Sequence, residues 1–155
     1  MNINKLQHYA FGLAMLTSVT WADRADYDSA RDLAINAEKA ISDQGTDVYT
    51  SINDRKDGFF DTDTKLYVFV IDADDKVIAN GGSKDSIGKD VKDIKIDGGG
   101  TLADRIDDIK KTPEEQGWVS YSWEPADSDK TMSKHSYLIY NKKYDVVVGS
   151  GAYKQ

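Results

Sequence analysis

The sequence predicts an α+β domain in which an antiparallel sheet packs against a long N-terminal helix. Residues 26–57 contain no proline and carry small and apolar side chains at helical spacing. Five later segments are rich in β-branched and aromatic residues, and short turns join several of them. Neighbouring strands that are joined by short turns pair antiparallel. The length of 155 residues fits a single domain.

Residues 1–22 are expected to be a cleaved signal peptide, which leaves residues 23–155 as the domain. Lys5 supplies a weak positive charge, residues 9–22 carry none, and small residues precede the expected cut after Ala22. The uncharged stretch is shorter than the roughly 20 residues that cross a bilayer core. The alternative is an uncleaved amphipathic anchor. We therefore expect a periplasmic or secreted bacterial protein, and the absence of cysteine is compatible with a periplasm.

The composition excludes several classes of function. The formal net charge of −7 disfavours binding to nucleic acid, whose phosphates attract basic surfaces. The absence of cysteine excludes disulfides and thiol chemistry. The acidic segments that begin at Asp61 and Asp72 lack the glycine and glutamate of a calcium-binding loop. We expect no metal, cofactor or catalytic residue, and hence no enzyme.

The helical region 26–57 has its apolar side chains three and four residues apart, which is the spacing of one helix face. Gly45 is expected to break or kink the helix, and Gly58 is placed to end it. The stripe either packs on the core of its own domain or pairs with a second copy, since three alanines allow close approach. Its members are Tyr27, Ala30, Ala34, Ala37 and Ile41, followed by Val48 and Ile52.

A long irregular stretch and a short helix interrupt the predicted strands. Residues 83–100 are rich in glycine and in lysine–aspartate pairs, and loops of this length often cover a binding site. Residues 101–111 have the pattern of an amphipathic helix, with Asp104 in the first turn and Pro113 beyond the end. The predicted strands are 66–72, 77–80, 117–124, 132–140 and 144–151, with tight turns at 73–76 and 141–143.

Several phrases carry a family resemblance when they are taken in order. They are DGFFDTDTKLYVFVIDADDKVIAN, SIGKDVKDIKIDGGG, GWVSYSWEP, SKHSYLIY and VVVGSGAY. The chain resembles the single Cache domain (type 2), the PAS-like extracytoplasmic sensor module of bacterial chemoreceptors and sensor kinases. The resemblance implies a five-stranded antiparallel sheet with the long helix on one face. It also implies a small-ligand pocket between the other face and a covering short helix and loops, with ligands that are often small carboxylates.

Two departures from the family pattern affect the expected function. The family usually has a histidine and a proline after the second strand, where this chain has Asn80 and Gly81. Asparagine can bond a ligand oxygen but carries no charge, so ligand identity does not carry over. The chain ends at Gln155, and we expect a chemotaxis or signal-transduction sensor head without its own output domain. It would bind a small ligand, or instead act as an interaction protein that docks through its N-terminal helix onto itself or a membrane receptor.

Four predicted strands supply the candidate ligand-binding residues. Tyr121 and Trp123 project from one strand face, and Lys134 is the candidate partner of a carboxylate. A cationic amine held by aromatic faces is the alternative ligand. The strand period separates Lys134 from Tyr137, so both can face the pocket only if a bulge intervenes. The full candidate set is Tyr67, Phe69, Asn80, Tyr121, Trp123, Lys134 and Tyr137.

Overall fold

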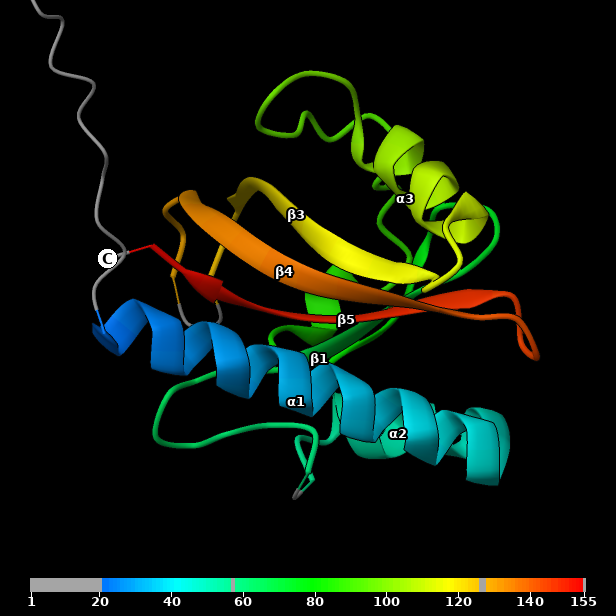
Figure 1. Cartoon of the computed structure of the whole chain (residues 1–155). Coiled ribbons are helices and arrows are strands. Elements are labelled where there is room, and N and C mark those ends of the chain that lie inside the picture. The colour runs from blue at the N-terminus through cyan, green and yellow to red at the C-terminus, as the bar shows by residue number, and fades with distance from the viewer. Residues whose placement is uncertain (1–20, 57, 126–127, 155) are drawn as a thin grey trace, which may run out of the picture.

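A computed structural model of the chain describes residues 21–56, 58–125 and 128–154. The predicted signal peptide lies outside these residues, except for its last two positions, which begin the first helix. One five-stranded sheet has helices α1 and α2 on one side and helix α3 with a long loop on the other (Figure 1). Within the described residues, no helix combines the length and the apolar character needed to cross a membrane.

The helical layer consists of α1 (Trp21–Gln44), the short 3-10 helix η1 (Gly45–Asp47) and α2 (Val48–Asn53). Gly45 has a φ of 79°, which glycine adopts without strain, so the predicted break at this residue is confirmed. Ala30, Ala34, Ala37 and Ile41 of the apolar stripe are fully buried against the sheet. The alternative that this stripe pairs with another copy is therefore wrong, because the domain's own core occupies it.

The sheet is antiparallel throughout, with strand order β2-β1-β5-β4-β3. The predicted class and all five strands are confirmed, with ends that differ by one or two residues. The C-terminal strand lies at the centre, so β1 and β4 both pair with it. The strands are β1 (Val68–Ile71), β2 (Val77–Asn80), β3 (Gln116–Trp123), β4 (Met132–Asn141) and β5 (Val146–Tyr153).

Alternation along the strands separates two apolar clusters. Val68, Val70, Val146 and Val148 point to the helical layer. The other face, called the pocket face below, carries the larger side chains. It carries Tyr67, which directly precedes β1. Its strand residues are Phe69, Ile71, Val77, Val119, Tyr121, Trp123, Lys134, Leu138, Tyr140, Val147 and Tyr153.

Helix α3 (Leu102–Lys111) covers one end of the pocket face. Its first turn is closed by a capping box, in which the Thr101 hydroxyl accepts from the Asp104 amide at 3.2 Å and the Asp104 carboxylate accepts from the Thr101 amide at 2.9 Å. Three side chains on one helix face are buried against the sheet. They are Leu102, Ile106 and Ile109, as the amphipathic pattern predicts.

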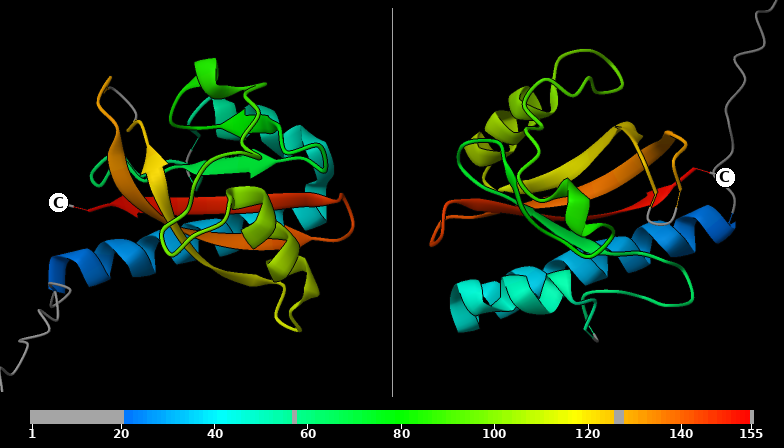
Figure 2. Two further views of the ribbon diagram at one scale, coloured as in Figure 1. Left: turned by 90° about the horizontal axis from the view of Figure 1, so that it is seen from above. Right: turned by 180° about the vertical axis from the view of Figure 1, so that it is seen from behind.

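The loop of residues 81–101 spans the pocket face from one edge of the sheet to the other (Figure 2). At the β2 edge, the Val77 amide donates to the Lys89 carbonyl at 3.0 Å. At the β3 edge, the Asp97 amide donates to the Ser120 carbonyl at 2.8 Å. The loop also contains the short 3-10 helix η2 (Lys84–Ser86). These bonds fix the loop as a cover over the pocket face.

Candidate functional site

Two glycines on β5 let neighbouring side chains pack directly against the backbone at the centre of the pocket face. A Cβ atom at Gly149 would overlap the ring of Phe69, and one at Gly151 would overlap Ser136. Because β5 carries no side chain at these positions, the Phe69 ring lies across it. Lys134 on β4 likewise reaches across β5 to Phe69 of β1 and to Tyr67, which directly precedes β1. The glycines of the sequence GSGAY thus position the site.

Lys134 is a buried lysine whose ammonium is surrounded by aromatic rings. Its side chain is 1% exposed, and Nζ donates to the Tyr67 hydroxyl at 2.9 Å. Nζ also lies 4.0, 4.8 and 5.3 Å from the ring centres of Tyr67, Phe69 and Tyr153. No carboxylate of the described residues forms an ion pair with it. Burial lowers the pKa of Lys134, because the charged form loses its hydration.

The hydroxyl groups beside Lys134 form a chain with a fixed direction. Tyr153 donates its proton to the carbonyl of Glu124 at 3.0 Å. The 2.9 Å bond between the Tyr67 and Tyr153 hydroxyls therefore has Tyr67 as the donor. The Tyr67 oxygen is left to accept from Lys134. This single acceptor leaves further N–H groups of the ammonium available to a ligand.

A small cavity of about 20 Å³, called the inner cavity below, lies next to Lys134. A cavity of this volume holds about one water molecule. Among the described residues, one cation and one amide line it, and no carboxylate does. Its lining residues are Phe69, Ile71, Val77, Asn80, Val91, Ile94, Leu102, Tyr121, Trp123 and Lys134.

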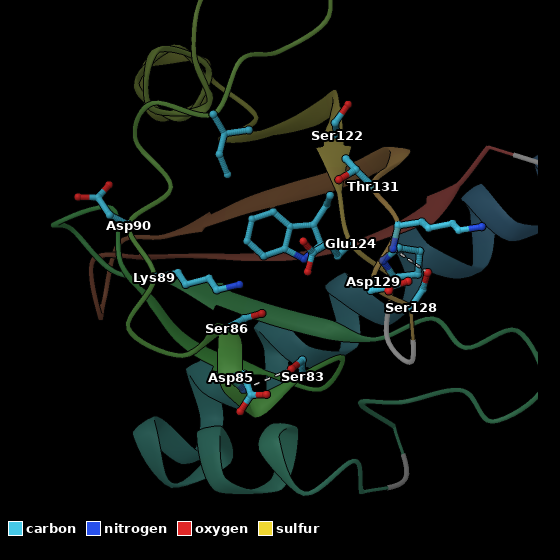
Figure 3. A pocket seen from close by; sticks show the side chains of 14 residues that line it. Ser83, Asp85, Ser86, Lys89, Asp90, Ser122, Glu124, Ser128, Asp129 and Thr131 are labelled. Atoms are coloured by element: carbon cyan, nitrogen blue, oxygen red, sulfur yellow. Dashed lines mark hydrogen bonds between the residues drawn. The ribbon is translucent and has the colours of Figure 1, made fainter.

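A larger open groove of about 1160 Å³, called the outer groove below, lies beside the inner cavity. Ile94 and Trp123 line both spaces, so they form the wall between them. Figure 3 shows the groove between η2 and the loop that follows β3. Its other lining residues are Ser83, Asp85, Ser86, Lys89, Asp90, Ser122, Glu124, Pro125, Ser128, Asp129, Lys130 and Thr131.

Asn80 occupies the end of β2, on the rim of the inner cavity. Its side-chain oxygen accepts from the amides of Gly82 at 2.7 Å and Ser83 at 3.0 Å. These bonds form a turn and fix the orientation of the amide. The NH₂ group is the part of this side chain that remains for a ligand, and it is a donor like Lys134.

A family model for the Cache domain matches residues 37–155. The chain belongs to the Cache domain family. Cache domains are extracytoplasmic sensor modules. Among curated proteins, none matches this chain significantly.

Solved structures of chemotaxis and Cache sensor domains share this fold. A methyl-accepting chemotaxis protein from Vibrio parahaemolyticus has 18% identity and a TM-score of 0.63, with 84% of this chain and 89% of that chain covered. A Cache chemosensory domain described for carboxylic acid recognition has 18% identity and a TM-score of 0.64, with coverage of 88% and 99%. A periplasmic sensor domain of a chemotaxis protein has 19% identity and a TM-score of 0.60, with coverage of 92% and 99%.

This Cache domain brings six of the seven candidate residues together on the pocket face or its rim. They are Tyr67, Phe69, Asn80, Tyr121, Trp123 and Lys134. Tyr137 does not join them, because it packs against Ala34 on the helical side of the sheet. Its placement in the pocket is therefore corrected. No bulge interrupts the pairing of β4 with its neighbours, so alternation puts Tyr137 opposite to Lys134.

Sequence reasoning missed several residues around the cavity of the Cache domain. The alternation of β5 could have predicted that Tyr153 lies on the pocket face, because it shares a face with Val147, Gly149 and Gly151. The loop residues Val91 and Ile94 gave no such signal, since loops have no periodic pattern. The remaining missed lining residues are Ile71, Val77 and Leu102.

In each of the two acidic turns of this Cache domain, the side chain of the first aspartate accepts hydrogen bonds from backbone amides of the same turn. Asp61 accepts from the amides of Asp63 at 2.8 Å and Thr64 at 3.1 Å. Asp72 accepts from the amides of Asp74 and Lys76, both at 2.9 Å. Among the described residues, no group of three or more acidic, histidine or cysteine side chains is arranged to hold a metal ion.

Proposed function

We propose that this Cache domain is a periplasmic or secreted sensor module that binds a small carboxylate in the inner cavity. Lys134 would form an ion pair with the carboxylate, and the NH₂ group of Asn80 would donate to it. The observation that carries the proposal is the buried ammonium of Lys134, which has a single hydroxyl acceptor and no acidic partner among the described residues.

The cost of burying a charge supports an anionic ligand. An isolated ammonium in an apolar interior is strongly disfavoured unless it is paired. Tyr67, Phe69 and Tyr153 offset part of this cost through their ring faces. A carboxylate would supply the missing opposite charge and accept charge-assisted hydrogen bonds.

The same geometry disfavours the alternative of a cationic amine. The aromatic faces that would hold an amine already surround the Lys134 ammonium. No acidic side chain of the residues that the structure describes lines the inner cavity, so a second cation there would be repelled by Lys134 without compensation. A structural neighbour is described for carboxylic acid recognition, which agrees with this choice.

Binding without chemistry is the role that the polar groups support. The inner cavity presents donors from Lys134 and Asn80, while the hydroxyl of Tyr121 is bonded to Ser136 at 3.0 Å. Burial raises the pKa of Tyr121 far above its ordinary value of 10.0, so this phenol stays protonated. We therefore propose that the domain holds its ligand and does not transform it.

Thermal-shift measurements on residues 23–155 test the proposal. Small monocarboxylates and small amines are screened against the wild type, Lys134→Met and the control Lys143→Met, which changes an exposed lysine of the β4–β5 turn. Carboxylates should stabilise the wild type and the control but not Lys134→Met. Stabilisation by amines alone, or carboxylate binding that survives Lys134→Met, would contradict the proposal.

A further inference from the structure

Lys134 is enclosed by side chains that carry no charge of their own. Tyr67, Phe69 and Tyr153 present ring faces to its Nζ atom at 4.0, 4.8 and 5.3 Å. Tyr121, its partner across β3 and β4, is a buried phenol. In the part of the chain that the structure describes, no acidic side chain forms an ion pair with Lys134. Dipoles and ring faces therefore offset only part of the hydration that an ammonium loses here.

The three phenols beside Lys134 keep their protons, so they supply no negative charge. Tyr67 donates its proton to the Tyr153 hydroxyl at 2.9 Å, and Tyr153 donates to the carbonyl of Glu124 at 3.0 Å. Burial raises the pKa of Tyr153 and of Tyr121 far above the ordinary value of 10.0. Between pH 7 and 10, Lys134 is thus the member of this cluster whose charge can change.

Charged side chains of the covering loops line the outer groove instead of the inner cavity. Figure 3 shows Lys89 and Glu124 among the side chains around that groove. The Lys89 ammonium lies 5.7 Å from the ring centre of Trp123, which belongs to the wall between the two spaces. Helix α3 contributes Leu102 to the inner cavity, and this side chain carries no charge. Neither the loops nor α3 therefore gives Lys134 a counter-charge within the inner cavity, as far as the structure describes its lining.

The charge of Lys134 depends on whether the site is empty or holds an anion. In the empty site, burial lowers the pKa of Lys134, because the charged form loses its hydration. A carboxylate in the inner cavity has the opposite effect, since an opposite charge within about 4–6 Å favours the ammonium. It would also accept charge-assisted hydrogen bonds from Nζ. Binding of an anion and binding of a proton therefore favour each other at this position.

We infer that the site binds a carboxylate together with a proton, which Lys134 takes up from the solvent when the ligand binds. The lone pair of the neutral amine forms the new N–H bond, and the product is an ammonium–carboxylate pair. This inference rests on the proposed function and deepens it, because the occupied site holds the components of an undissociated acid. At alkaline pH, occupancy would report the concentrations of the carboxylate and of the proton together.

The pH dependence of the affinity follows from the sign of this coupling. A bound carboxylate raises the pKa of Lys134 above its value in the empty site. The affinity is therefore complete below the empty-site pKa and falls as the pH rises above it. For one linked proton, the association constant should fall by up to about tenfold per pH unit. The ligand carboxylate itself stays ionised throughout this range.

Isothermal titration with acetate, lactate and succinate between pH 7 and 10 tests the inference. Each titration is run in two buffers that differ in ionisation enthalpy, because a proton taken from the buffer changes the observed heat. The proteins are wild type, Lys134→Arg and Lys89→Met. Arginine keeps its charge over this pH range, and Lys89→Met removes the lysine beside Trp123 at the outer groove. NMR titration of Lys134 Nζ in the wild type, with and without each probe, measures its pKa directly.

The expected result is that the wild type takes up as much as one proton per ligand in the pH range where its affinity falls. Lys89→Met should behave in the same way. Lys134→Arg, where it binds a probe, should show no dependence on the buffer and no fall in affinity. The NMR titration decides the question if Lys134→Arg does not fold or does not bind, and it should give Lys134 a higher pKa when a probe is bound.

The contrary outcomes separate this inference from the proposed function. Wild-type binding without proton uptake at every pH, or an unchanged pKa of Lys134, overturns the inference and leaves the carboxylate site standing. Proton uptake that disappears in Lys89→Met overturns the assignment to Lys134. Binding of none of the three probes to the wild type overturns both the inference and the proposed function.

Discussion

Lys134 and Tyr67 are joined by a 2.9 Å hydrogen bond although β5 separates their strands. Lys134 pairs with Tyr153 of the central strand, and Gly151, which carries no side chain, lies two residues before Tyr153. It brings a cation from the C-terminal half of the chain to a phenol that follows the helical region. The site is thus an arrangement of β1, β4 and β5, and it depends on the order of the strands.

Tyr67→Phe should destabilise the domain, because it removes the hydroxyl that accepts from Lys134. A buried donor that loses its acceptor costs about 1–3 kcal/mol. Urea unfolding at neutral pH measures the change. Tyr49→Phe is the matched control, since Tyr49 is half-buried on the helical side of the sheet. Equal losses in the two variants would show that the bond contributes nothing specific.

Lys134→Met should change how stability depends on pH. Burial lowers the pKa of Lys134 below 10.5, so between the lowered value and 10.5 the unfolded chain binds a proton that the folded chain does not. The free energy of unfolding of the wild type therefore gains a contribution that rises with pH across this window. Lys134→Met lacks it.

The measurement is urea unfolding of both proteins at several pH values between 7 and 10. The advantage of Lys134→Met over the wild type should be largest at the lowest pH and should shrink as the pH rises. Lys143→Met, in an exposed turn, controls for the loss of a lysine. A difference that stays constant over the whole range would contradict a lowered pKa.

Gly151→Ala should destabilise the domain because its Cβ would overlap Ser136 and the carbonyl of His135. Overpacking of this kind typically costs about 1–3 kcal/mol. The neighbouring Ser150→Ala is the contrast. The Ser150 hydroxyl is buried without a hydrogen-bond partner in the described structure, so its removal should leave stability unchanged or raise it by about 1 kcal/mol. Thermal unfolding measures the stability of both variants. Equal losses of stability in Gly151→Ala and Ser150→Ala would contradict the steric explanation.

Lys76→Ala should raise the pKa of Asp90 at the edge of the outer groove. The Lys76 ammonium donates to Asp90 at 2.7 Å, and the Lys92 amide donates at 3.0 Å; together they lower this pKa to about 2. The Lys76 hydrogen bond is the larger of the two causes, so its removal should return the pKa of Asp90 toward 3.8. NMR titration of the side-chain carboxyl carbon measures it. Lys84→Ala, whose partner is Asp54, should leave Asp90 unchanged.

Most of the fold could be predicted from sequence, because periodic burial leaves a readable pattern. The alanine stripe predicted α1 but not its partner, since the same spacing serves a sheet or a second helix. Burial of Ala34 against Tyr137 and Ile139 decides between them. The same contact explains the error at Tyr137, where the residue type suggested a pocket while the strand period pointed away from it.

The candidate site was less predictable, because it depends on space and on long-range contacts. Alternation placed Tyr121 and Trp123 on one face of their strand and separated Lys134 from Tyr137, but it did not decide which of these two residues faces the pocket. No pattern shows that the Lys134 ammonium is buried among three rings. The wall residue Ile94 lies in an irregular loop, whose path depends on hydrogen bonds to both sheet edges.

The attachment of the loop 81–101 to β2 and β3 also bears on aggregation. These strands are the two edges of the sheet, and an uncovered edge recruits strands from other chains. The loop engages backbone groups of Val77 on one edge and Ser120 on the other. Deleting it to open the site would expose both edges, so truncated forms should associate and precipitate. Single substitutions in the wall leave this protection in place.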